Sequence, residues 1–170
     1  MCQDYTAGAE ATLTAGTYIV FVDDVLAGIS GPYTLVVREA VTPTAVTGND
    51  ACSAAHAITA DGSWSGANSS LTNQGDGSCA TATGGLEAWF TFTLTASTDV
   101  HVDTFGSDYD TVLFIREGSC TGTEAGCNLN AGFRTESALD LTLAAGTYYL
   151  AVDGAVSTAT GNYQLNVMGL

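Results

Sequence analysis

The sequence has 170 residues, of which 18 are Asp or Glu and only 3 are Lys or Arg, so its formal net charge is -15. This charge argues against nucleic acids and anionic membrane surfaces as partners, because both attract positive charge, and it suits cation binding or simple solubility. No run of about 18 apolar residues is present, so no membrane span is expected.

A repeated segment organises the chain. Residues 13–37 match residues 143–167 at an offset of 130, and 11 of the 25 aligned positions are identical without a gap. Each copy begins with a Gly turn that leads into β-branched and aromatic residues, the composition of a strand, and ends in an alternating apolar and polar stretch. In the second copy, strands at 147–152 and 161–167 are predicted to form an antiparallel pair that closes a domain.

The repeat divides the chain into three parts. Residues 1–38 are the C-terminal half of a repeat unit, 39–48 form a Thr-rich linker that contains Pro43, and 49–170 are a complete unit. The N-terminus has neither the basic nor the apolar region of a signal peptide. We therefore expect either that a leader has been removed or that the sequence is a piece of a longer chain.

The complete unit is predicted to be all-β. Residues 53–58 fit a helical turn or a strand equally well, and 61–85 form a loop with at most a short strand near Trp64. No segment shows a sustained helical period, and short strands with turn signals between them favour a β-sandwich. The clearest further strands are expected at 88–95, 99–104, 110–116 and 139–143.

Four cysteines lie in the complete unit, and their even number in a chain poor in charge favours disulfides and an oxidising compartment. Cys120 and Cys127 bracket a short loop, so we expect them to be paired and Cys52 to be paired with Cys79. Zinc is the alternative, but the usual C-x2-C spacing is absent and neither histidine is near a cysteine in sequence.

Cys2 has no partner in this scheme. When the two copies are aligned, it lies within five residues of the place of Cys127. We expect it either to mark a truncated unit or to bond to or contact a neighbouring chain.

Five stretches of the complete unit carry a family resemblance, and they are Asn49-Asp50, 88–94, 106–113, 145–149 and 161–165. They resemble the bacterial pre-peptidase C-terminal domain family and its cysteine-bearing relatives in secreted proteins. They occur in the family's order and cover nearly all of 49–167. The resemblance implies a jelly-roll-like antiparallel β-sandwich that is secreted and has no catalytic activity of its own.

Two acidic clusters are candidate calcium sites, because Ca²⁺ takes six to eight oxygen ligands. Asp108 and Asp110 flank Tyr109 on a loop that leads into a strand, although Asp also commonly caps turns there. The second set is suggested by the resemblance, since some collagen-binding relatives hold calcium with Asn-Asp at the start of the domain and acids before the first long strand. Here it comprises Asn49, Asp50, Asp76 and Glu87, the last standing where typical members have Asp.

No catalytic residues are predicted. His101 is expected to be an exposed strand residue beside Asp103, and the stretch 62–66 has Trp64 where a hydrolase elbow requires Ser. Asn68-Ser69-Ser70 is a formal N-glycosylation sequon.

These patterns predict a non-enzymatic extracellular module, structural or adhesive, that forms tandem repeats or filaments with copies of itself at a cell surface. The open strands expected in 1–38 favour this interpretation, because unpaired sheet edges recruit other strands. The alternative is an accessory domain of a secreted hydrolase that binds collagen or polysaccharide.

Overall fold

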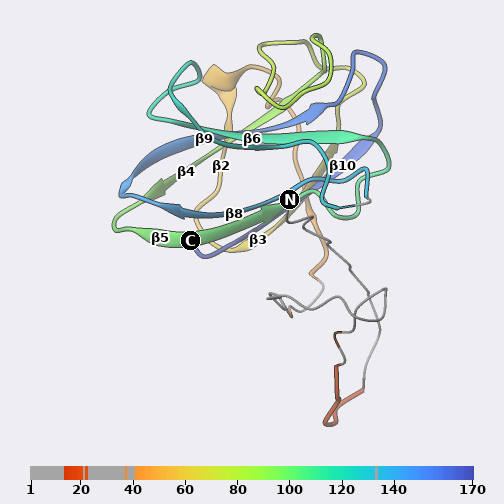
Figure 1. Ribbon diagram of the computed structural model, residues 1–170, viewed down its shortest axis with the longest axis vertical. Helices are drawn as coiled ribbons and strands as arrows, with labels where there is room; N and C mark the ends of the chain where they lie inside the picture. The colour runs from red at the N-terminus through yellow and green to blue at the C-terminus, as the bar shows by residue number, and fades with distance from the viewer. Residues whose placement is uncertain (1–13, 21, 23–36, 38–40, 133) are drawn as a thin grey trace, which may run out of the picture. The chain divides into compact units, whose positions relative to one another are not determined.

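The computed structural model describes residues 14–20, 22, 37, 41–132 and 134–170 (Figure 1). Residues 42–170 belong to one compact unit, and the described residues before Thr42 belong to another. Most of the expected half-unit at 1–38, including Cys2, lies outside the described residues.

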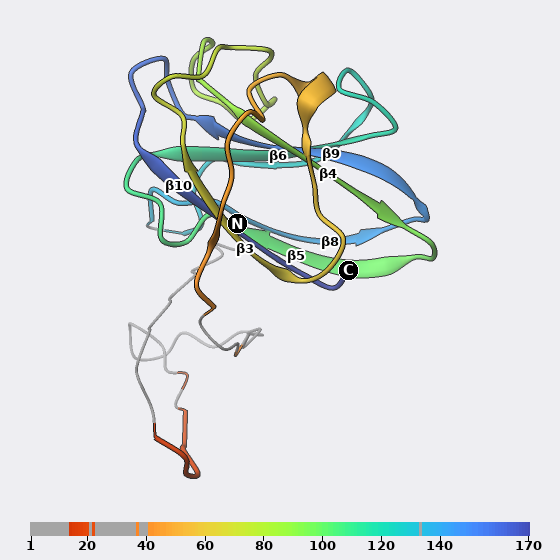
Figure 2. The same cartoon turned by 180° about the vertical axis from the view of Figure 1, so that it is seen from behind.

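Residues 42–170 fold as two five-stranded sheets that face each other (Figures 1 and 2). Sheet A has the order β1 (Thr44–Ala45), β3 (Gly62–Ala67), β10 (Asn162–Met168), β5 (Thr98–Asp103) and β8 (Ala138–Leu143). Sheet B has the order β2 (His56–Ala57), β4 (Ala88–Leu94), β9 (Gly146–Gly154), β6 (Thr111–Glu117) and β7 (Glu124–Asn128).

The β-sandwich expected from the strand pattern is confirmed, with two differences. The sheets are mixed, because the short strands β1 and β2 run parallel to β3 and β4 while the other neighbours are antiparallel. β1 also lies in the segment expected to be a linker.

The expected antiparallel pairing of the last two strands is wrong. β9 lies between β4 and β6 in sheet B, whereas β10 lies between β3 and β5 in sheet A. Their connection therefore crosses from one sheet to the other, and each strand already has a neighbour on both sides.

Residues 53–58, which fitted either a helical turn or a strand, contain parts of both. A 3-10 turn, η1 (Cys52–Ala54), is followed by β2, and the short strand expected near Trp64 is β3.

Sheet B is covered on both faces, which explains the continuous apolar run of β6. Leu113 and Ile115 point into the main core between the sheets, whereas Val112 and Phe114 belong to a second apolar cluster with Trp89. The side chains of these four residues are fully buried. A strand buried on both faces favours continuous hydrophobicity over alternation.

Candidate functional site

The outer face of sheet B is covered by the cap loop, which we define as residues 72–86. Trp89 and Phe114 lie beneath it, in edge-to-face contact with ring centroids 5.5 Å apart. At Gly77, a Cβ atom would lie 2.7 Å from Phe114 Cδ1 and 2.8 Å from Cys127 Sγ. The backbone therefore approaches this face so closely that a side chain at Gly77 would collide with it.

Two disulfides tie down this covered face, but not in the expected pairs. Cys52 is bonded to Cys120, with the Cα atoms 5.9 Å apart, and Cys79 is bonded to Cys127, with the Cα atoms 5.8 Å apart. The expectation of Cys52–Cys79 and Cys120–Cys127 is corrected.

The hairpin formed by β6 and β7 explains why Cys120 and Cys127 are not bonded to each other. Arg116 pairs with Glu124, so Cys120 lies in the connecting turn. Cys127 pairs with Phe114 further along the strand. Each of the two cysteines bonds instead to a segment that covers the sheet, which is η1 for Cys120 and the cap loop for Cys127.

Two carboxyl groups are buried side by side where the cap loop meets the sheet. Glu87 directly precedes β4, and Asp153 follows Val152, the β9 partner of Ala88. Neither residue has measurable solvent exposure. Burial raises the pKa of Glu87 to about 7, and burial together with the charge of Glu87 raises the pKa of Asp153 to about 8.

Each buried carboxyl group has one oxygen in a hydrogen bond and one without a partner. Glu87 Oε1 accepts from the backbone N–H of Gln74, and Asp153 Oδ1 accepts from that of Gly154 at 2.7 Å. Glu87 Oε2 and Asp153 Oδ2 have no hydrogen-bond partner. A Cβ atom at Gly85 would overlap Asp153 Oδ1, so only glycine lets the cap loop approach this closely.

The other expected metal ligands make structural hydrogen bonds. The amide of Asn49 is buried and donates to Trp89 O and Tyr163 Oη, each at 3.3 Å. Asp50 Oδ1 accepts from the backbone N–H of Thr72 at 2.6 Å, and Asp76 Oδ1 accepts from that of Gly84 at 2.7 Å. These contacts hold both ends of the cap loop.

The residues of the second expected cluster also make hydrogen bonds within the fold. Asp108 Oδ1 and Oδ2 accept from the backbone and side-chain nitrogens of Asn162 at 2.7 and 2.8 Å, which is the turn-capping alternative. Asp110 accepts through its main-chain oxygen from Ala155 N at 3.0 Å. Within the described ranges, no three His, Cys, Asp or Glu side chains lie close enough together to hold a metal ion.

Asn68, the sequon residue, is fully buried. Its side-chain nitrogen donates to Leu86 O at 3.0 Å and to Ala159 O at 3.1 Å, and its oxygen accepts from Gly161 N at 2.8 Å. In the folded domain this side chain joins three loops and is not accessible to a glycosyl transferase.

His101 lies between two carboxylates on the outer face of sheet A, so the expectation of an exposed strand histidine is only partly right. Its Nε2 is 3.0 Å from Asp103 Oδ2, and its Nδ1 is 2.7 Å from Asp140 Oδ1 on the neighbouring strand β8. The hydrogen bond to Asp103 raises the pKa of His101, Asp140 adds to this rise, and burial opposes it.

We expect His101→Gln to reduce the stability of the protein below neutral pH more than above it. A histidine whose folded-state pKa is raised contributes stability that is complete below its ordinary pKa of about 6.5 and is lost as the pH rises through the folded-state value. Unfolding free energies at pH 5.5 and 8.5, measured by denaturant titration for both proteins, test this expectation. Equal loss at the two pH values would mean that the ion pairs contribute nothing.

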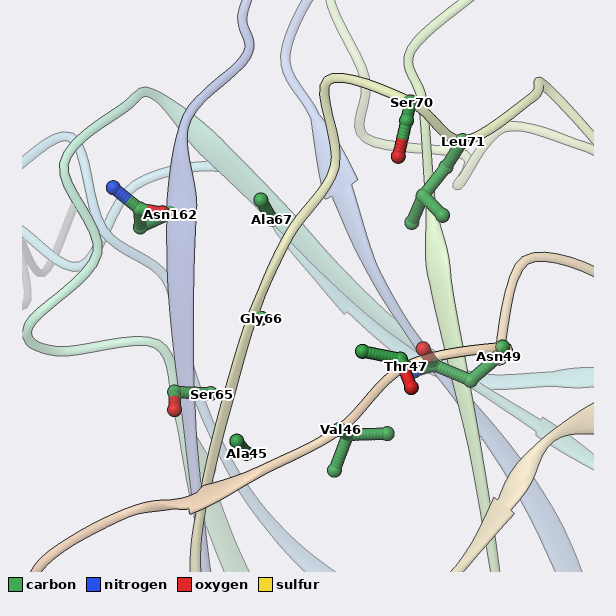
Figure 3. A pocket seen from close by; sticks show the side chains of 11 residues that line it. Ala45, Val46, Thr47, Asn49, Ser65, Gly66, Ala67, Ser70, Leu71 and Asn162 are labelled. Atoms are coloured by element: carbon green, nitrogen blue, oxygen red, sulfur yellow. The ribbon is translucent and has the colours of Figure 1, made fainter.

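A shallow groove of about 560 Å³ runs along the edge of sheet A (Figure 3). One wall is the segment 45–49 and the other is β3 with the residues that follow it. Val46 and Leu71 give the groove an apolar part, whereas Ser65, Ser70 and Asn162 supply polar groups.

A family model described as galactose binding domain-like, and associated with the type IX secretion system (T9SS), matches residues 48–167. The chain belongs to this galactose-binding-domain-like family. The match includes all of sheet B, sheet A apart from β1 and the last residue of β10, the cap loop and all four disulfide cysteines.

Among solved structures, the galactose-binding-domain-like chain is similar to the pre-peptidase C-terminal domain of collagenase from Bacillus anthracis. The two share 16% sequence identity with a TM-score of 0.48, over 66% of this chain and 93% of that domain. A search of curated proteins gives no match.

The galactose-binding-domain-like family indicates a non-catalytic binding or accessory module, and its T9SS association together with the two disulfides indicates a secreted protein. In the described part of the chain, no helix has the length and hydrophobicity needed to cross a membrane.

Proposed function

We propose that this chain is a secreted structural or adhesive module whose copies assemble at the cell surface through the repeated strand sequence at 13–37. The observation that carries the proposal is the difference in burial between equivalent positions of the two copies. Val20 is 58% exposed and Val37 is 75% exposed, whereas their counterparts Leu150 and Val167 are fully buried.

In the complete unit, the counterparts of these residues are buried because they belong to the core between the two sheets, and the backbones of β9 and β10 are paired on both sides. The first copy has the same residue pattern, and no strand is assigned among its described residues 14–20, 22 and 37. Strands from another copy would provide the missing backbone partners and cover the apolar side chains. A head-to-tail contact of this kind builds an open filament or a linear array of modules unless its rotation closes a ring.

The test is the size of the full-length protein as a function of concentration, measured by light scattering and electron microscopy. We expect the wild type to form regular assemblies, and Val20→Asp to prevent them because a charge would have to be buried at the contact. Thr17→Asp is the matched control, because its counterpart Thr147 lies at the partly exposed start of β9.

A wild-type protein that stays monomeric at high concentration would contradict the assembly proposal. It would favour the second candidate, an accessory module that binds collagen or polysaccharide. The family description and the groove with its mixed apolar and polar lining support saccharide as the ligand of that candidate.

A further inference from the structure

We propose that the edge strand β8 of one copy is the surface to which residues 33–38 of a second copy add a further strand. The β8 edge would then be the acceptor surface of the assembly proposed above, on which this inference rests. Sheet A ends at β1 and β8, and sheet B ends at β2 and β7 (Figure 1). A strand from another chain can extend a sheet only at one of these four edges.

β8 offers the longest regular edge of the four. β1 and β2 have two residues each, and the pairing of β7 with β6 is interrupted by a register shift between Ile115 and Arg116. β8 has six residues, and all of them pair with β5 in one register. It contains no Pro, Lys or bulge, which commonly protect an edge from another strand.

Alternate backbone groups of β8 point away from β5. Ser137 O accepts from Thr104 N at 2.9 Å, so every second residue from Ser137 onward bonds toward β5 and the residues between them direct their backbone groups outward. The outward N–H of Ala138 donates to a side-chain oxygen of β7 at 3.1 Å. In the part of the chain that the structure describes, the outward N–H groups of Asp140 and Thr142 have no protein acceptor, so they are available to an added strand.

The inward side of β8 is incompletely covered. Leu139 and Leu141 pack against the main core but are only partly buried, whereas Leu143, at the end of the strand, is buried. An added strand with apolar side chains on the same side would remove the two half-buried leucines from water.

Residues 33–38 have the pattern that this edge requires. Their counterparts lie in β10, where every second side chain points into the core. Met168, the counterpart of Arg38, lies opposite His101 on the outer face. The same alternation gives residues 33–38 one apolar face and one face that carries Arg38. Val37, on the apolar face, is 75% exposed in its own chain.

The charges of the two strands are complementary. The Asp140 side chain lies on the outer face of β8 and is 72% exposed, and its Oδ1 contacts His101. Asp99 and Asp103 lie on the same face of the neighbouring strand β5, so three carboxylates outweigh the single charge that His101 can carry. A strand that ends in Arg38 brings one of the few cations of the chain to these acids.

This charge pairing favours an antiparallel register with Arg38 opposite Asp140. In that register Val37 lies beside Leu141, so the apolar faces of the two strands coincide. The other strand sequence of the first copy, 17–22, is followed by two aspartates and would bring like charges to the same edge. Residues 33–38 are therefore the better donor for β8.

The experiment measures, by light scattering, the concentration at which the full-length protein begins to assemble. Asp140→Arg and Arg38→Asp should each raise this concentration by about tenfold or more, because like charges would then face each other across the contact. A variant with both changes should recover assembly, since opposite charges face each other again. Glu117→Arg is the matched control, because it makes the same charge change at an exposed residue of sheet B, and it should assemble like the wild type.

Hydrogen exchange of the wild type gives a readout that needs no variant. The amides of Asp140 and Thr142 should be protected in the assembled protein and exchange freely in dilute protein. If the wild type assembles while these amides still exchange freely, the copies use another surface, and the β8 inference is overturned although the assembly proposal stands. Equal onset of assembly in Asp140→Arg and Glu117→Arg would also overturn it. A wild type that stays monomeric at every concentration overturns both proposals.

Discussion

Replacing Cys79 and Cys127 with Ala is expected to lower the free energy of unfolding by about 4 kcal/mol. The bond closes a loop across 48 residues, and in the chain-entropy model a loop of this length constrains the unfolded chain by that amount. The Cys52–Cys120 bond spans 68 residues, and because the dependence on loop length is logarithmic, its removal should cost nearly the same. Denaturant unfolding of the two double variants measures both losses.

Peptide mapping without reduction tests the pairing itself. The bonds alternate along the chain, so cleavage between Cys79 and Cys120 should leave the two halves of the unit joined by two disulfides. Linked peptides that contain Cys52 with Cys79, or Cys120 with Cys127, would contradict the structure.

The cysteine pairing shows where sequence spacing stops being informative. Cys120 and Cys127 are close in sequence, but the register of the β6–β7 hairpin places one in the turn and the other on a strand opposite Phe114. Composition indicated correctly that these residues form disulfides. The partners depend on which segments lie over sheet B, and local spacing carries no information about that.

The positions of the strands in the sequence were easier to predict than the strands that each one pairs with in the sheets. The alternating residues of β4 and β10 and the apolar run of β6 reflect how many faces of each strand are buried, so they can be read locally. Whether β9 pairs with β10 or with β4 depends on long-range packing. The predicted β9–β10 pair is wrong because these strands, although consecutive in sequence, lie in different sheets.

The buried carboxyl pair was half visible in the sequence. The family resemblance pointed to Glu87 and grouped it with Asn49, Asp50 and Asp76. In the structure the side chains of those three residues make hydrogen bonds elsewhere. Asp153 lies 66 residues further on and becomes its neighbour only through the β4–β9 register. A signal was present in the sequence, since an Asp that directly follows the apolar run 150–152 is unusual for a buried strand.

Leu150→Ala is expected to lower the free energy of unfolding by about 2 to 5 kcal/mol, because it leaves a cavity in the core between the sheets. The matched change in the first copy, Val20→Ala, removes a side chain that is 58% exposed. In dilute solution it should alter stability by no more than about 0.5 kcal/mol, as surface substitutions do. Denaturant unfolding of each variant, followed by fluorescence, gives both values.

The comparison becomes decisive when protein concentration is varied. If strands of another copy cover Val20 in the assembly, its truncation should weaken association and shift the onset of assembly to higher concentration, while the effect of Leu150→Ala on unfolding stays independent of concentration. The same residue pattern would then serve as core in one copy and as interface in the other. If Val20→Ala is as costly as Leu150→Ala in monomeric protein, residues 13–37 are already buried within their own chain and cannot be the surface that joins copies together.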